Sequence, residues 1–212
     1  MTISLNLPFM RKPKEGQPGG AASAPEQPES EEELRHRIYK FIIERYREVI
    51  EEQETRSVSD MKAAVKPHEP KIAEIKEALT GEFHPYVYEE NFLAAAKMAY
   101  EYVSSFRTVS VPVSFWLSFT DMGELMAGDE IDKSILLCSL LRALGSENAK
   151  VFVTDSKNSY VLFQFSGKSY VVDHSQKEIA AKETGEDALQ SIKGKILYSF
   201  NDKEYEDFQE SE

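Results

Sequence analysis

The chain has 212 residues, of which 37 are acidic and 25 basic, so its formal net charge is -12 at pH 7. This excess of negative charge argues against a nucleic acid or an anionic membrane as the main partner, because both attract positive surfaces. A single cysteine excludes an internal disulfide. No apolar run approaches the roughly 20 residues of a membrane-spanning helix. We therefore expect a cytoplasmic protein with one main domain and shorter appendages.

The first 29 residues are predicted to lie outside any packed core. Residues 1–10 form a short apolar peptide in which hydrophobic and polar residues alternate, and residues 11–29 are rich in Pro, Gly, Ala, Ser and Glu. That composition is typical of a disordered linker. The peptide is either a frayed terminus or a docking segment that adds to a sheet edge or a groove. Its basic residues follow the apolar ones, an order that a secretory signal does not have.

Residues 30–106 are predicted to be helical. Ser30 and Glu33 have the spacing of a capping box, which marks the start of the first helix. Its apolar stripe is expected to pack on the core or on a neighbouring helix, with a coiled-coil dimer as the alternative. Further helices are predicted over 59–65, 70–81 and 88–106.

Residues 107–202 are predicted to form the core, and residues 203–212 an acidic tail. A helical turn at 120–126 precedes a long apolar helix from Asp129 to Leu144, which Gly145 ends. The period then changes to the alternation of strands, predicted over 151–153, 160–165, 169–173 and 196–200, with a short helix at 186–192. Helices followed by an antiparallel sheet indicate the α+β class.

One stretch of the core resembles a known family. The residues Gly128-Asp129-x-x-Asp132-Lys133-Ser134 and the later Leu-Arg-Ala-Leu-Gly ending at Gly145 resemble the nucleophile-bearing helix of the transglutaminase-like superfamily, which has a papain-like fold. The match is to the archaeal or bacterial version that reads Gly-Asp-Cys-x-Asp-Lys-Ala. The resemblance implies a central helix that packs on a small antiparallel sheet, with a catalytic Cys, His and Asp where the two meet.

Two of these three catalytic positions are changed in this chain. Glu130 occupies the nucleophile position, where a carboxylate suits the helix dipole but is a poor acyl-transfer nucleophile. The histidine position falls on Asn158 or Ser159, and neither side chain is a general base near pH 7. Asp173 matches the aspartate position. The triad is therefore degenerate, and we expect no catalytic residues of the family type.

Other reactive residues are predicted to be structural. Cys138 lies among leucines and is expected to be a small buried hydrophobe. His174 is expected at a strand end or on the surface. Four residues have side chains of the types that bind metals, namely Glu130, Asp132, Asp173 and His174. Their spacing matches no metal-binding motif, so neither a metal nor a cofactor is expected.

Three hypotheses of function follow from this pattern. The favoured one is a catalytically inactive domain that binds a protein or peptide partner in the old substrate cleft. The candidate cleft residues are Trp116, Glu130, Asp132, Asn158, Tyr160 and Asp173. The alternative is a hydrolase or peptidase-like enzyme of altered chemistry that uses Glu130 and Asp173 as a carboxylate pair. A third is a structural subunit whose first helix, with Phe41 and Ile42, forms an interface. The sequence does not decide the oligomeric state.

Overall fold

The computed structural model describes residues 30–52, 57–109, 116–174 and 178–208, without the side chains of Ile42, residues 46–52 and Glu178. The chain forms two compact units, Met1–Arg47 and Glu48–Glu212. The predicted N-terminal peptide and linker lie outside the described residues. In the segments that are described, no helix is long and apolar enough to cross a membrane.

Helix α1 (Glu31–Glu52) begins where the capping box predicts. The Glu33 carboxylate accepts hydrogen bonds from the Ser30 amide at 2.9 Å and the Ser30 hydroxyl at 2.8 Å. One turn on, Arg35 pairs with Glu31 at 2.9 Å. These contacts give hydrogen-bond partners to groups at the start of the helix that have none within it, and they fix where the helix begins. The packing of its apolar stripe remains a prediction.

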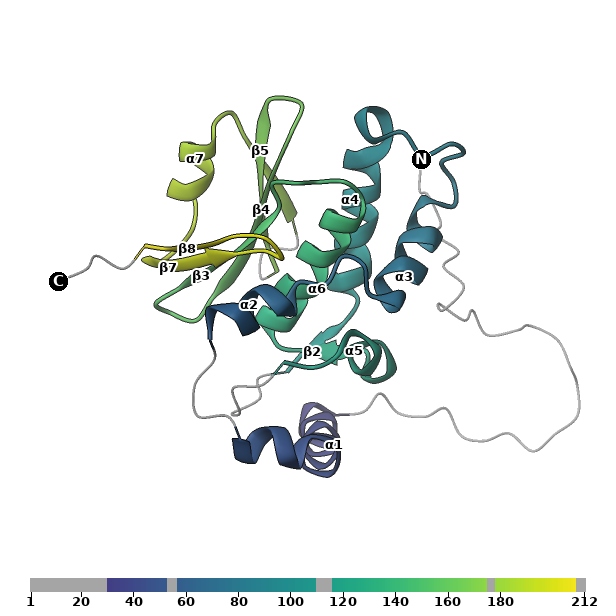
Figure 1. Ribbon diagram of the computed structural model, residues 1–212, viewed down its shortest axis with the longest axis vertical. Coiled ribbons are helices and arrows are strands. Elements are labelled where there is room, and N and C mark those ends of the chain that lie inside the picture. Colours follow the sequence, from purple (N-terminus) through teal and green to yellow (C-terminus); the bar gives the residue numbers. More distant parts are fainter. Residues whose placement is uncertain (1–29, 53–56, 110–115, 175–177, 209–212) are drawn as a thin grey trace, which may run out of the picture. The chain divides into compact units, whose positions relative to one another are not determined.

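Helix α6 (Glu130–Ala143) is the centre of the second unit. Helices α3 (Pro70–Thr80) and α4 (Tyr88–Ser104) pack against it, and α5 (Phe119–Leu125) packs against α3. Helix α2 (Val58–Ala64) precedes α3. In the segment between them, the Lys66 amide donates to the Ser139 hydroxyl on α6 at 3.1 Å. Figure 1 shows α3, α4 and α6 side by side, with the sheet on the opposite side of α6.

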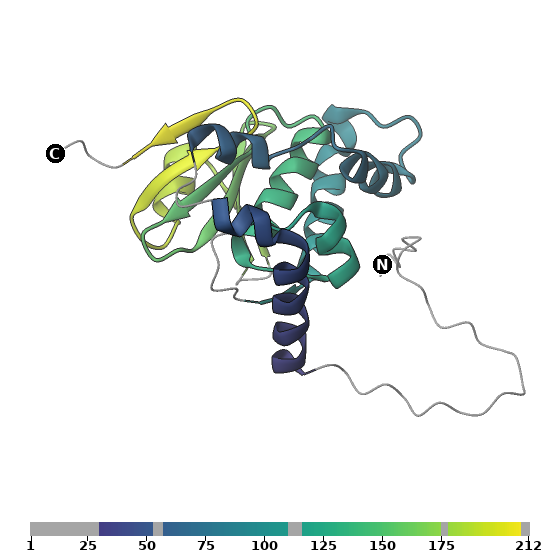
Figure 2. The ribbon, with the colours of Figure 1, turned by 60° about the horizontal axis from the view of Figure 1, so that its bottom comes forward.

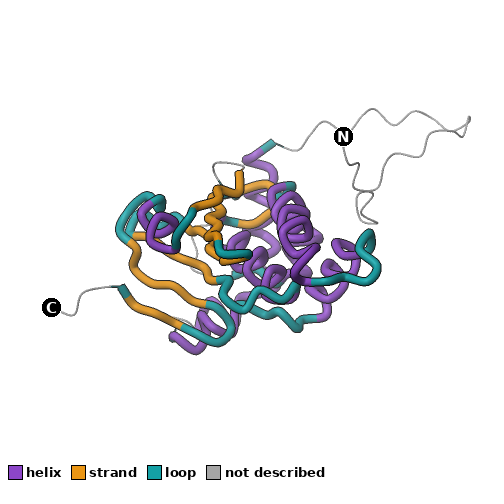
Figure 3. Tube along the Cα trace, turned by 90° about the horizontal axis from the view of Figure 1, so that it is seen from above, coloured by secondary structure: helices purple, strands orange, loops and turns teal. Residues whose placement is uncertain are grey.

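The described residues form a six-stranded antiparallel sheet in the order β6-β5-β4-β3-β7-β8. Its strands are β3 (Lys150–Thr154), β4 (Ser159–Phe165), β5 (Lys168–Asp173), β6 (Glu178–Lys182), β7 (Ile196–Phe200) and β8 (Tyr205–Asp207). The short strands β1 (Arg107–Thr108) and β2 (Ala127–Gly128) pair in parallel beside it. Figure 2 and Figure 3 show the strands of this sheet gathered on one side of the unit, and Figure 1 shows α7 (Gly185–Gln190) on the same side, across the sheet from α6.

The two faces of the sheet are covered differently. On the face toward α6, Val161 and Phe163 are buried, and Phe163 meets Phe92 of α4 edge-on at 5.6 Å. On the other face, α7 (Gly185–Gln190) covers a smaller apolar cluster that contains Phe152, Tyr160, Val171, Ala188 and Ile192. Since side chains alternate along a strand, Ser159 and Val161 point toward α6 while Tyr160 points away from it.

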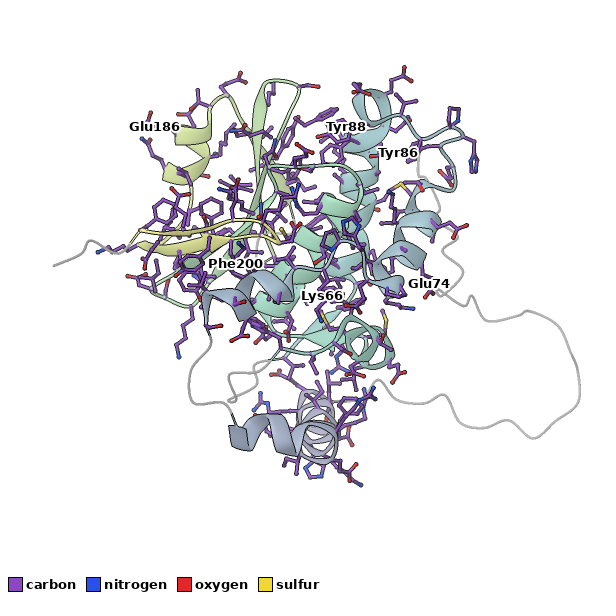
Figure 4. All side chains as sticks on the ribbon, viewed as in Figure 1. Lys66, Glu74, Tyr86, Tyr88, Glu186 and Phe200 are labelled. Atoms are coloured by element: carbon purple, nitrogen blue, oxygen red, sulfur yellow. The ribbon has the colours of Figure 1, made fainter. Side chains whose placement is uncertain are left out.

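The C-terminal end of α6 is closed as the sequence predicts. Leu144 caps the helix and Gly145 follows with φ +110°, a conformation that favours glycine. A Cβ on Gly145 would also lie 2.9 Å from the Tyr88 ring. The labelled Tyr86 and Tyr88 lie together at the start of α4 in Figure 4. Gly145 is thus required both by its backbone conformation and by the close approach of Tyr88.

The α+β class and the central helix on an antiparallel sheet are confirmed. Four strands were not predicted, namely the short pair β1 and β2 and two strands of the six-stranded sheet. β6 adds an edge to β5, and β8 forms a hairpin with β7 inside the segment expected to be an acidic tail. The hairpin forms because the Asn201 side chain accepts the amides of Lys203 and Glu204 at 2.9 and 2.8 Å. Lys150 then pairs with Glu204 at 2.7 Å, which offsets the repulsion among the acidic residues.

Candidate functional site

The N-terminus of α6 is held in place by a complete capping box. The Asp129 carboxylate accepts the Asp132 amide at 2.7 Å, and the Asp132 carboxylate accepts the Asp129 amide at 3.3 Å. Glu130 is therefore the first helical residue, at the positive end of the helix dipole and half-buried. This is the position at which the resemblance implies a cysteine.

Asp132 and Trp116 have structural partners. Asp132 is buried and its second oxygen accepts the Leu117 amide at 3.2 Å, which ties the segment before α5 to α6. The Trp116 ring stacks on Phe200 of β7, with centroids 6.4 Å apart. Both candidate cleft residues therefore help to build the frame around the site.

The two candidate histidine positions differ in how they lie relative to α6. The Ser159 hydroxyl lies 2.9 Å from the Ser134 hydroxyl, one helical turn after Glu130, and both are buried. Asn158 instead belongs to the turn between β3 and β4, where its carbonyl accepts the Thr154 amide at 3.0 Å. Ser159 is thus the residue of this pair that faces α6.

Tyr160 and Asp173 are paired across β4 and β5 and lie on the face away from α6. The Tyr160 ring belongs to the cluster under α7, where burial and then the Asp173 charge raise its pKa. Hydrogen bonds from the Lys193 backbone and the Asn158 side chain oppose that rise. Asn158, Tyr160 and Asp173 are therefore together at the end of the strand pair.

Two residues that the sequence interpretation did not count among the cleft candidates belong to this region, Lys133 beside Glu130 and His174 near Lys133. The Lys133 ammonium is buried and donates to the Phe106 carbonyl and, at 2.8 Å, to the Thr108 hydroxyl. Burial lowers its pKa, and the Glu130 charge opposes that effect. A lysine in the first turn of an otherwise apolar helix was the available signal.

His174 is the second of these residues, and it directly follows β5, at the strand end that was one of its two expected positions. Its ring stacks on Tyr100 of α4 at 6.3 Å, and both ring nitrogens are buried without a hydrogen-bond partner among the described residues, although the edge of the side chain reaches solvent. Burial and the nearby Lys133 charge lower its pKa to about 4, against the pull of Asp173. The signal was alternation: His174 follows buried Val172 by two residues and therefore shares its face.

We call Glu130, Lys133, Asp173 and His174 the α6 N-terminal cluster. Burial raises the pKa of Glu130, the charges of Asp173 and Asp129 raise it further, and Lys133 lowers it. The cluster thus holds two carboxyl groups that repel each other, an ammonium already engaged by two oxygens, and a neutral imidazole. Such a set of perturbed groups is typical of a functional site.

Thiol chemistry has no candidate in this chain. Its single cysteine, Cys138, is fully buried on α6, and its thiol donates to the Ala149 carbonyl at 3.6 Å. Burial raises the pKa of this thiol strongly, so it stays protonated and unreactive. The prediction of a buried structural cysteine is confirmed.

Two hollows lined by described residues lie away from the cluster. One, of about 570 Å³, lies between α2 and Asp202, and the other, of about 340 Å³, lies beside the β4–β5 turn. Within the described part of the chain, no three His, Cys, Asp or Glu side chains are placed to hold a metal ion. The α6 N-terminal cluster is therefore recognised by the perturbed pKa values of its side chains and not by a hollow or a metal-ligand set.

Comparison with solved structures finds distant likeness to LapG of Legionella pneumophila. The EGTA-treated form is 13% identical, with 73% of this chain and 87% of that chain covered and a TM-score of 0.45. The calcium-bound form is 14% identical, with 74% and 91% covered and a TM-score of 0.46. A third LapG structure is 14% identical, with 72% and 88% covered and a TM-score of 0.47. Likeness at this distance assigns no activity. No family model matches the chain, and no curated protein matches it in sequence.

Proposed function

We propose that this chain is a binding module for a peptide or protein segment, built on a transglutaminase-like frame that has lost its thiol chemistry. The observation that carries the proposal is the first turn of α6. Glu130, the first residue of this helix, is where the resemblance implies the cysteine, and Ser159, one of the two candidates for the implied histidine, faces the helix. A central helix on an antiparallel sheet without a thiol or an imidazole at these positions supports binding rather than thiol catalysis.

The frame can be tested by restoring the lost chemistry. Glu130→Cys with Ser159→His places a thiol at the helix N-terminus beside an imidazole on β4, and both features lower a thiol pKa. We expect iodoacetamide to alkylate this variant at pH 6 about tenfold faster than the variant Glu130→Cys alone. The matched control is Glu130→Cys with Asn158→His, whose imidazole sits in the β3–β4 turn. Equal rates for the two double variants would contradict the transglutaminase-like frame.

Binding is tested with a displayed library of random peptides presented to the full chain. The affinity of each enriched peptide is then measured for the natural chain, for Glu130→Arg and for Glu124→Arg, a control on the exposed face of α5. We expect peptides that bind the natural chain and Glu124→Arg but bind Glu130→Arg at least about tenfold more weakly. If no peptide is enriched, or if every enriched peptide ignores Glu130→Arg, the binding proposal is wrong.

A hydrolase of altered chemistry is the second candidate. It is favoured by one observation, the raised pKa of Glu130, which suits a general acid near a second carboxylate. The test is the turnover of p-nitrophenyl acetate by the natural chain and by Glu130→Gln. A rate at least about 100-fold higher for the natural chain supports the enzyme, because general acid–base groups contribute on that scale. Equal rates exclude it.

A further inference from the structure

The six-stranded sheet has two edge strands, which differ in length and in charge. The strand β8 is three residues long and contains Glu206 and Asp207, which are both exposed. The strand β6 is five residues long, and between Glu178 and Lys182 at its ends it has neither a charge nor a proline. Natural sheets shorten or charge their edge strands because an open edge pairs with other chains. By this rule β8 is protected against pairing and the middle of β6 is not.

The outer edge of β6 has no neighbouring strand in the described part of the chain. The strand pairs with β5 along all five of its residues, and it ends the strand order. Ala181 is exposed, and Lys182 makes no ion pair with any other residue that the structure describes. Alternate N–H and C=O groups of an edge strand point away from the sheet, so this edge has the groups needed to pair with another strand.

The sequence of β6 is complementary to itself in the antiparallel direction. A pair of β6 strands centred on Ala180 sets Glu178 of one copy opposite Lys182 of the other, and it does so at both ends. Between them, Ile179 lies opposite Ala181. Residues two apart share a face of the sheet, so this register keeps the faces of the two copies continuous. Opposite charges directly across an antiparallel pair are favourable.

The charges along the two edges favour self-pairing at β6 and oppose it at β8. Within the sheet, Glu178 lies opposite Asp173 of β5, so its cross-strand neighbour has the same charge. A lysine on the other side of Glu178 offsets that repulsion. At β8, the corresponding symmetric pair would set Glu206 opposite Glu206 of the second copy, which is unfavourable. Charge complementarity therefore assigns a second copy of the chain to the β6 edge.

We propose that β6 pairs in the antiparallel direction with β6 of a second copy of this chain, about a two-fold axis at Ala180, so that the two sheets become one continuous sheet. The same five residues form both sides of the interface, as a two-fold dimer requires. The backbone of the two strands supplies the hydrogen bonds, and the charges of Glu178 and Lys182 set the register. This interface goes beyond peptide binding and does not involve Glu130 or Ser159.

The experiment measures the mass of the full chain by sedimentation equilibrium over a series of protein concentrations. We expect a concentration-dependent dimer of twice the chain mass of 24.1 kDa. Lys182→Glu sets glutamates opposite each other at both ends of the pair, and it should raise the dissociation constant of the dimer at least about tenfold. The matched control is Lys97→Glu at an exposed site on α4, which changes the net charge equally and should dimerise like the natural chain.

A mixture of two variants separates a lost interface from a misfolded chain. Glu178→Lys alone sets lysines opposite each other, and Lys182→Glu alone sets glutamates opposite each other. In an equimolar mixture, every lysine of the first variant faces a glutamate of the second. We therefore expect the mixture to dimerise like the natural chain, although each variant alone does so at least about tenfold more weakly.

A disulfide locates the axis. Ala180→Cys should give a covalent dimer under mild oxidation, because residues directly opposite on antiparallel strands have Cα atoms about 4.5–5.5 Å apart. Ala181→Cys is the control, since its Cα would lie about 7–8 Å from that of its own copy, beyond the reach of a disulfide.

Three results would overturn the inference: a natural chain that stays monomeric at every concentration, a dimer that Lys182→Glu leaves unchanged, and a mixture of the single variants that stays monomeric. If Phe41→Glu dissociates the dimer and Lys182→Glu does not, the interface belongs to the first helix. If the chain is monomeric and peptides from the library lose affinity for Lys182→Glu, the β6 edge takes a strand of a partner, and self-pairing is wrong.

Discussion

The two ends of α6 differ in how completely their charged groups are partnered. At the C-terminal end, the Arg142 guanidinium makes two hydrogen bonds to Asp202, at 2.5 and 3.1 Å, and donates to the carbonyls of Ser146 and Glu147. The carbonyl of Leu144, the C-cap residue, accepts a hydrogen bond from the Tyr86 hydroxyl at 2.8 Å. The buried charge at this end, Arg142, thus has a carboxylate and two carbonyl oxygens as partners.

At the N-terminal end the balance is different. Glu130 and Asp173 repel each other, and His174 has two unpartnered nitrogens beside a buried lysine. One helix thus has one end built for stability and one end that retains unsatisfied polar groups. Natural proteins accept such a cost mainly where a ligand or a reaction uses the groups.

The largest effect is expected at the C-terminal end. Arg142→Met keeps the aliphatic stem but removes the cation, which leaves Asp202 without a partner although both side chains are mostly buried, at 5% and 19% exposure. We expect a loss of about 3 kcal/mol in the free energy of unfolding, measured with urea. The control is Lys168→Met in the exposed pair with Glu183, where the change should stay below about 1 kcal/mol. A small effect of Arg142→Met would remove the contrast between the two ends.

The next effect is a pH dependence at the N-terminal end. The pKa of His174 is lowered from 6.5 to about 4, so the folded state binds fewer protons than the unfolded state within this window. Stability is therefore lost as the pH falls from 6.5 to 4, by on the order of 3 kcal/mol for this group. His174→Phe keeps the stacking on Tyr100 and removes the titration, so its urea midpoint should fall less over this range. The control His36→Gln, at an exposed site on α1, should follow the natural chain.

The contrast between the ends also shows what sequence reasoning can reach. Gly145 had to end the helix, because this follows from a local rule. The strands β3, β4, β5 and β7 followed from alternation, and the α+β class followed from the order of the elements. The helix from Asp129 to Leu144 was predicted, and its capping box of Asp129 and Asp132 is a finding of the structure.

The N-terminal cluster depends on long-range register, which local patterns do not contain. That Ser159 rather than Asn158 faces α6 depends on how β4 lies against the helix, and a shift of one residue reverses it. The strand-end position of His174 was among the expectations, but its stacking on Tyr100 was not, because nothing in its sequence neighbourhood indicates that α4 lies there. The strand β8 was hidden by its acidic composition, since the stabilising Lys150 is more than 50 residues away in the sequence.

A smaller effect tests whether the N-terminal frame is rigid. Ser134→Ala and Ser159→Ala each remove one partner of a buried hydroxyl pair 2.9 Å apart and leave the other unsatisfied. Each should cost about 1–2 kcal/mol, and the double variant should cost less than the sum by about 1 kcal/mol. Additive losses would mean that the two hydroxyls do not interact, and that β4 is not fixed against α6 at this point.

The smallest effect concerns Glu130 itself. Because its pKa is raised by burial and by Asp173, the folded state binds its proton more readily than the unfolded state does. Its contribution is therefore unfavourable above the raised pKa and disappears as the pH falls below the ordinary value of 4.5. Glu130→Gln should gain stability relative to the natural chain as the pH rises from 4 to 7. The gain should be only about 0.5 kcal/mol, since solvent screens a half-buried group.

A second comparison is made in the background of Asp173→Asn. There the stability difference at pH 7 between Glu130 and Gln at this position should be smaller, because the charge that raises the pKa of Glu130 is gone. If Glu130→Gln is instead less stable, relative to the natural chain, at pH 7 than at pH 4, the Glu130 carboxylate is stabilised by a positive charge in the folded chain, and the N-terminal end is partnered like the C-terminal end.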